Sequence, residues 1–115
     1  MTCQPAVELL IGHRSWLVRN DFLGYVECWR GFHGESMAAI DWLAVWAALK
    51  DGHLPCSRGE GQVLRVAASI AEGVPIDLRD VATCLDAVNS ALVARAVLTA
   101  GGHGEAAAAL AGMTA

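Results

Sequence analysis

The sequence predicts an all-α fold, a compact single-domain bundle of five or six helices with at most one short extended segment. Helix-capping residues are the first reason, since Ser57 with Glu60 matches a capping box and Gly73 stands where that helix should end. Apolar residues also recur at helical spacing over most of the chain. The length of 115 residues predicts one domain over 1–115, because two domains of about 55 residues would each bury too little surface.

The N-terminal half is predicted to begin with a helix over 6–18. Five residues at helical spacing form its buried face: Leu9, Leu10, His13, Trp16 and Leu17. Gly12 within this helix costs about 1 kcal/mol relative to alanine. A second helix is predicted over 20–30, with a strand over 22–29 as the alternative because apolar residues also alternate there. Residues 37–40 are expected to be extended.

A third helix is predicted over 42–50, with Asp41 as its N-cap. Trp42 and Trp46 share one face, and most other positions are apolar as well. Such a helix is buried between neighbours or lies in an interface. All seven aromatic residues lie between Trp16 and Trp46. We therefore expect the N-terminal half to supply an aromatic layer to a core that the C-terminal half completes with alanine, valine and leucine.

The C-terminal half is predicted to form three helices, over 58–72, 78–83 and 87–100. The first carries one polar stripe, formed by Gln62, Arg65, Ser69 and Glu72. Asp77 and Asp86 are the expected N-caps of the other two. This succession of helices and tight turns predicts a helix-turn-helix-like tri-helical segment over 62–100. The alanine-rich stretch 105–111, within the tail 103–115, is expected to fray.

Composition favours association with another protein. Hydrophobic residues make up 55% of the chain and charged residues 17%, where about a quarter is usual for the charged class. A small chain of this kind has more apolar surface than one core can bury, and self-association is the simplest outlet. On the apolar helices over 42–50 and 87–100, four residues are expected to contact the partner: Trp42, Trp46, Val93 and Val97.

Charge and hydropathy disfavour two other classes of partner. The net charge of −4 argues against nucleic acid, which is normally bound by a basic face. The longest apolar run, over 42–49, is far shorter than the roughly 20 residues that a membrane-spanning helix needs. No basic leader precedes an apolar stretch, so we expect a cytoplasmic protein. In that reducing compartment the cysteines are expected to be free thiols: Cys3, Cys28, Cys56 and Cys84.

One segment resembles the second and third helices of bacterial winged-helix regulators. Their L-x-x-L-A-x-x-L pattern is matched by Leu78, Val81, Ala82 and Leu85, and the register continues through Ser90 and Leu92. The resemblance implies helix-turn-helix geometry over about 62–100. This chain departs from the pattern at the turn, where Asp86 replaces the usual glycine. It departs again on the third helix, where Val93 and Val97 stand among positions that are polar or basic in DNA readers.

A longer stretch resembles a group of small helical actinobacterial proteins. The matching residues are Asp41-Trp42, Leu54-Pro55-Cys56-Ser57, 67–71, Asp77-Leu78-Arg79-Asp80 and Leu85-Asp86. The resemblance implies a helical fold and brings no activity with it. The group commonly has glycine where this chain has Cys84, so no thiol role is carried over to that position.

The sequence indicates no catalytic constellation and no metal or cofactor site. Zinc ligands usually come in close pairs such as C-x-x-C, and the closest pair here is His53 with Cys56. The segment 34–38 superficially matches a G-x-S-x-G nucleophile elbow, but that motif needs a strand, a sharp turn and a helix in an α/β sheet. His13, on an apolar helix face, is interpreted as a core histidine.

Cys56 is the candidate reactive thiol. It directly precedes the N-cap Ser57, where free backbone amides and the helix dipole favour a thiolate. His53, three residues away in the same loop, would supply a base. The alternative is that Pro55 and Cys56 act as a hydrophobic staple to the following helix.

We therefore expect a non-catalytic protein–protein association module, and a homodimer as its simplest form. The alternative function is a DNA-binding transcriptional regulator, which would require Arg65, Arg79 and Arg95 to gather on one face. A third function is a thiol or small-ligand sensor at Cys56 and His53.

Overall fold

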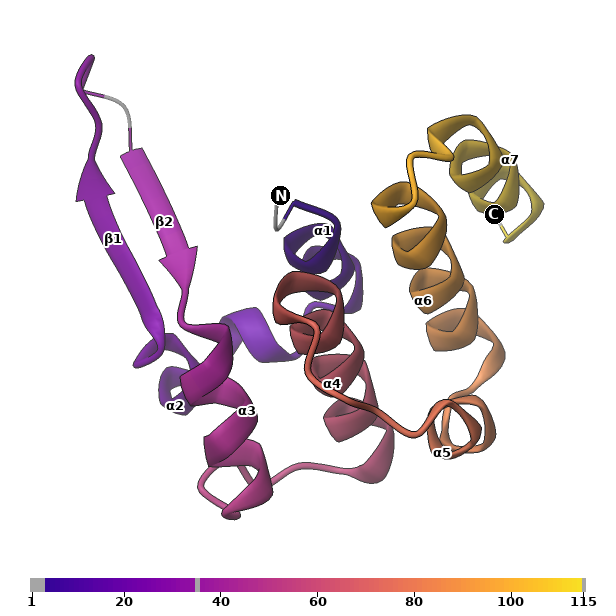
Figure 1. Ribbon diagram of the computed structural model, residues 1–115, viewed down its shortest axis with the longest axis horizontal. Helices are drawn as coiled ribbons and strands as arrows, with labels where there is room; N and C mark the ends of the chain where they lie inside the picture. The colour runs from indigo at the N-terminus through magenta and orange to yellow at the C-terminus, as the bar shows by residue number, and fades with distance from the viewer. Residues whose placement is uncertain (1–3, 35, 115) are drawn as a thin grey trace.

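The computed structural model describes residues 4–34 and 36–114. Within them it has seven α-helices, one 3₁₀ turn and one β-hairpin (Figure 1). The first half contains α1 (Gln4–His13), η1 (Trp16–Val18), α2 (Asn20–Leu23), β1 (Val26–Arg30), β2 (Ser36–Ile40) and α3 (Trp42–Lys50). The second half contains α4 (Arg58–Glu72), α5 (Leu78–Cys84), α6 (Ala87–Ala100) and α7 (Gly104–Thr114). The fold is largely α, as predicted, but it is not purely all-α and has more helices than five or six.

Strand β1 of a β-hairpin replaces the second half of the helix predicted over 20–30. β1 pairs with β2 in an antiparallel register that sets Val26 opposite Ile40 and Arg30 opposite Ser36. The helix prediction is wrong beyond Leu23, and the strand alternative is confirmed from Val26 onward. β1 contains valine and tryptophan, two residue types that fit the pleated surface of a strand well. The extended segment expected at 37–40 is its partner strand.

The hairpin stands clear of the helices (Figure 1). Its base is joined to the start of α3 by a hydrogen bond from the Asp41 N–H to the Tyr25 carbonyl, at 2.9 Å. Along β1, the four residues after Val26 are exposed. The hairpin therefore contributes little to the core, which is formed by the helices.

α1 ends five residues earlier than predicted, at His13. Arg14 has a φ of +76°, and its N–H donates to the Leu10 carbonyl at 2.8 Å. A left-handed residue in this position is a common helix end, although glycine usually occupies it. Trp16 is nevertheless fully buried, as the periodicity predicts, because η1 turns it back toward α4. Its indole N–H donates to the Glu60 carbonyl at 2.9 Å.

Gly12 lies where α1 meets α6. A Cβ at this position would be 2.9 Å from Cδ2 of Leu92, which is closer than side chains normally approach. The contact is with the flexible end of a side chain, so a larger residue at this position would require Leu92 to shift.

α4 is the centre of the fold and contacts α1, α3, α5 and α6. The predicted capping box at its start is present, since Ser57 accepts from the Glu60 N–H and Glu60 accepts from the Ser57 N–H. Gly73 ends the helix with a φ of +73°. Asp77 and Asp86 cap α5 and α6 as predicted. The largest fully buried side chains around this helix are Trp16, Phe22, Leu10, Leu54, Leu64, Val45, Val63 and Val81.

The alanine-rich tail forms α7 and packs against α6. Ala107 is buried in this contact. The stretch 105–111 is helical in the structure, and the expectation that it frays stays a prediction. No helix in the part of the chain that the structure describes is long and apolar enough to cross a membrane.

Candidate functional site

α6 is far less buried than α4, the one helix that is longer. Only Val93 and Ala96 are buried among its fourteen residues. Val97 is 56% exposed and Val88 70% exposed, although both are large apolar residues. α6 packs against α1 and α7, and these contacts leave a large part of its apolar surface open to solvent.

An apolar groove of about 480 Å³ lies between α5 and α6. Its lining comes from the two helices and the turn between them: Leu78, Val81, Ala82, Leu85, Ser90, Val93, Ala94, Val97 and Leu98. Ser90 is the one polar residue of this set, and no charged residue lines the groove. Leu78 at one edge is 71% exposed. A groove with this lining favours a ligand or partner that presents apolar surface.

The four predicted partner-contacting residues do not share one surface. Trp42, at 3% exposure, belongs to the core, so its assignment to an interface is corrected. Val93, at 9% exposure, is nearly buried and also lines the α5–α6 groove. Trp46 is half-buried and lines a different pocket, with the Lys50 ammonium 5.8 Å from its ring centroid. Val97 alone is an exposed part of the α5–α6 groove.

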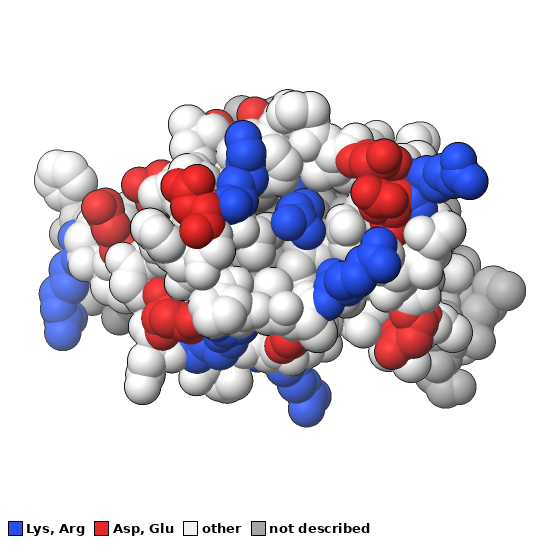
Figure 2. Space-filling view, turned by 90° about the horizontal axis from the view of Figure 1, so that it is seen from below, with Lys and Arg blue, Asp and Glu red and all other residues white. Residues whose placement is uncertain are grey.

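The three arginines that a DNA-binding surface would need are distributed over separate places. Arg65 lines a pocket next to Asp77 and Asp80, and Arg95 lines a groove between α1 and α6. Arg79 lies on α5 and lines neither. Figure 2 shows one face of the molecule, where basic side chains are interspersed with acidic ones and most of the surface is uncharged. This distribution differs from the continuous basic surface that nucleic acid attracts.

Cys56 lies beside the first turn of α4. A Cβ added to Gly61 would be 3.3 Å from its sulfur and equally far from Nη1 of Arg65, so the thiol and the guanidinium flank this glycine. Burial of the thiol and the nearby Glu60 carboxylate raise the pKa of Cys56. The arginines around it oppose this shift without reversing it. This direction is opposite to the one expected for a thiol at a helix start, and the assignment of Cys56 as a reactive thiol stays a prediction.

Among the described residues, the His53 side chain forms no hydrogen bond with the Cys56 thiol. Its backbone N–H donates to the Ala48 carbonyl at 2.9 Å, which closes the turn after α3, and its side chain is exposed. The two residues share a loop, as predicted, without forming a nucleophile–base pair.

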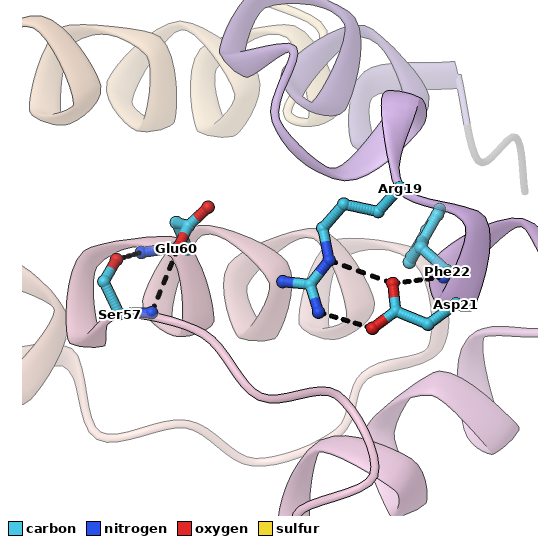
Figure 3. A network of polar contacts seen from close by, with 5 residues as sticks. All are labelled: Arg19, Asp21, Phe22, Ser57 and Glu60. Atoms are coloured by element: carbon cyan, nitrogen blue, oxygen red, sulfur yellow. Dashed lines mark hydrogen bonds and ion pairs between the residues drawn. The ribbon is translucent and has the colours of Figure 1, made fainter.

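Two local sets of polar contacts lie near each other, one in the segment after α1 and one at the start of α4 (Figure 3). The Arg19 guanidinium donates to both carboxylate oxygens of Asp21 and lies 4.4 Å from the ring centroid of Trp16. This hydrogen bonding lowers the pKa of Asp21 and raises that of Arg19. The Ser57 N–H lowers the pKa of Glu60 in the same way. Each of these groups has a partner close by in the sequence, so both sets act as local structural contacts.

The described residues contain no group of three histidine, cysteine, aspartate or glutamate side chains that could hold a metal ion. Cys28, Cys56 and Cys84 are free thiols, as predicted, and Cys3 lies outside the described residues. His13 is half-buried, and its Nδ1 atom is buried without a hydrogen-bond partner in the described part of the chain. Of the segment 34–38, residue 35 lies outside the described residues, and Ser36 begins β2.

No protein-family model matches this chain, and no curated protein or solved structure is significantly similar to it. The two resemblances drawn from the sequence therefore stay predictions.

Proposed function

We propose that this protein is a self-association module that dimerises through the α5–α6 groove. The observation that carries the proposal is an apolar groove, free of charged lining, beside α6, a helix in which two of fourteen residues are buried. Two copies related by a twofold axis would place the same groove on both sides of the interface. Leu78 and Val97, which are exposed in one copy, would then be buried against the other.

Charge supports a second copy as the partner. A self-complementary interface sets each residue near its own counterpart, so a charged lining would bring like charges together. The lining of this groove carries no charge and can face itself without that penalty. The net charge of −4 then acts only at longer range, where salt screens it.

The surface area of the chain supports the same partner. The accessible surface is 7096 Å², whereas a compact monomer of 12.1 kDa should have roughly 6,000 Å². The excess, about 1,000 Å², is similar to the surface that each protein buries in a standard interface, about 800 Å². The hairpin, which projects from the helices (Figure 1), contributes to this surface, as do the exposed residues Leu78 on α5 and Val97 on α6.

Sedimentation velocity on Val97→Glu tests this proposal. A charge placed in an apolar interface should weaken the dimer at least roughly 100-fold, because an unpaired buried charge costs several kcal/mol. Leu78→Glu, on the opposite edge of the groove, should have the same effect.

Val18→Glu is the matched control, because Val18 is 79% exposed and lies on η1, outside the groove. It should dimerise like the unmodified chain, and all three variants should keep the same helical circular dichroism spectrum. A folded Val97→Glu variant that still dimerises would refute this interface. An unmodified chain that stays monomeric at high micromolar concentration would refute self-association itself.

A further inference from the structure

A second pocket, of about 470 Å³, lies between α3, α4 and the loop before α5. It is lined by Trp46, Arg58, Gln62, Arg65, Pro75, Ile76, Asp77 and Asp80. This volume is within the range of small-molecule sites, about 300–1,000 Å³. The pocket combines an aromatic ring, two apolar loop residues and charges of both signs. It shares no residue with the α5–α6 groove, so it is a separate site.

Gln62 is the most informative residue of this pocket. It is only 9% exposed, and it is the buried polar residue of the described core. Its amide forms no hydrogen bond with the described residues, yet neither of its polar atoms is fully enclosed. The amide therefore opens into the pocket. A nearly buried amide without a protein partner costs stability, and such groups in native proteins call for an explanation such as a ligand.

The charged residues of the pocket are also unpaired. Within the described residues the one ion pair joins Arg19 to Asp21, so Arg58 and Arg65 have no carboxylate partner. Asp77 already accepts from the backbone N–H groups of Arg79 and Asp80. The Asp80 carboxylate lines the same pocket as the two arginines and is too far from them for an ion pair. Positive and negative groups thus face one space without neutralising each other.

We propose that this pocket binds a small zwitterion, namely a free α-amino acid with an apolar side chain. Its carboxylate would accept hydrogen bonds from Arg58 and Arg65, whose guanidinium groups match carboxylate geometry. The Gln62 amide would supply a further donor or acceptor, and the Asp80 carboxylate would bind the ammonium group. The apolar side chain would pack on Trp46, Pro75 and Ile76. The polar stripe of α4 is then one wall of a binding site rather than a solvated helix face.

Isothermal titration of the whole protein with each of the twenty proteinogenic L-amino acids tests this proposal. At least one apolar amino acid should bind. Two analogues of that amino acid serve as comparisons: one lacks the amine and the other lacks the carboxylate. Each should bind at least roughly tenfold more weakly, because it leaves either Asp80 or the two arginines without a charged partner. No binding across the panel would overturn the proposal. Equal binding of the acid lacking the amine would overturn the zwitterion assignment.

Two substitutions and two controls locate the site. Arg65→Gln and Asp80→Asn should each weaken binding at least tenfold. Arg79→Gln and Asp51→Asn, exposed residues outside the pocket, should bind like the unmodified chain. Equal effects of pocket and control substitutions would overturn the assignment.

Gln62→Leu provides a readout that does not depend on ligand. It should raise the melting temperature of the ligand-free protein, because leucine removes a nearly buried amide without a partner. The same variant should lose ligand binding while remaining folded. A Gln62→Leu variant that binds the amino acid as tightly as the unmodified chain would place the ligand elsewhere.

Discussion

α4 and α6 are helices of similar length that play opposite parts in this fold. Seven of the fifteen residues of α4 are buried, whereas two of the fourteen in α6 are. α6 is nevertheless the more apolar sequence, since α4 carries Arg58, Glu60, Arg65 and Glu72 and α6 carries only Arg95 as a charged residue. The central position of α4, between α1, α3, α5 and α6, decides its burial. Apolar composition therefore identifies side chains that are unfavourable when exposed to water, and the topology decides which of them are buried within the chain itself.

The largest expected difference is in the free energy of unfolding when one apolar side chain is truncated on α4 and one on α6. Leu64→Ala, at a fully buried position of α4, should lower the free energy of unfolding by about 2–5 kcal/mol. Val97→Ala on α6 should change it by less than about 0.5 kcal/mol in dilute, monomeric protein. Urea denaturation of both variants measures the two values. Equal losses would mean that α6 is covered within the monomer, and the comparison would fail.

A methyl group at Gly12 tests how closely α6 fits α1. Gly12→Ala should raise stability by clearly less than the roughly 1 kcal/mol that alanine gains in an open helix, because the added methyl group requires the flexible end of Leu92 to shift. Leu92→Ala in the same chain should restore the full gain. Gly112→Ala is the control, since no described atom outside its own stretch of helix lies within 4 Å of its Cβ position. A Gly12→Ala variant that gains as much as Gly112→Ala would show that the helices do not meet there.

A smaller gain in stability is expected at the end of α1, the helix that contacts both α4 and α6. Arg14→Gly should raise the free energy of unfolding by about 0.5 kcal/mol, because glycine adopts the left-handed conformation without the cost of a side chain. Arg14→Ala keeps that cost and should bring no gain. Thermal unfolding of the two variants distinguishes them, and equal midpoints would argue against strain at Arg14.

The smallest effect is expected from pH at the start of α4. The pKa of Glu60 is lowered in the folded protein, so the unfolded chain binds a proton more readily. The contribution of this carboxylate to stability is therefore present above the ordinary glutamate pKa of 4.5 and is lost as pH falls through the lower, folded value. Glu60→Gln keeps the capping geometry without ionising. Its unfolding free energy should fall less steeply below pH 4.5, and an identical pH profile would contradict the assignment.

The elements that can be predicted from sequence are those whose ends are set by local chemistry. Ser57, Asp77 and Asp86 act through their own hydrogen bonds to nearby backbone, and Gly73 through its freedom to adopt positive φ. The β-hairpin is ambiguous because residues 22–29 satisfy helical and alternating patterns alike. The end of α1 has no local signal, since arginine rarely adopts the left-handed conformation that Arg14 has here.

The candidate sites depend on tertiary contacts, and this limits what the sequence can predict. Trp42 and Val97 both lie on apolar helices, and only packing shows that Trp42 is in the core and Val97 at the surface. The polar stripe of α4 is evident in the sequence, whereas the burial of Gln62 depends on the loop that returns past it. A stripe of this kind normally indicates a solvated face, so the pocket is found only when α3, α4 and α5 are seen together.

Native mass spectrometry of the unmodified chain beside Val97→Glu tests the central claim most directly. We expect a species at twice 12.1 kDa for the unmodified chain and at 12.1 kDa for Val97→Glu. The Val18→Glu control should give the dimer. A monomer in all three samples, or a dimer that persists in folded Val97→Glu, would contradict self-association through the α5–α6 groove.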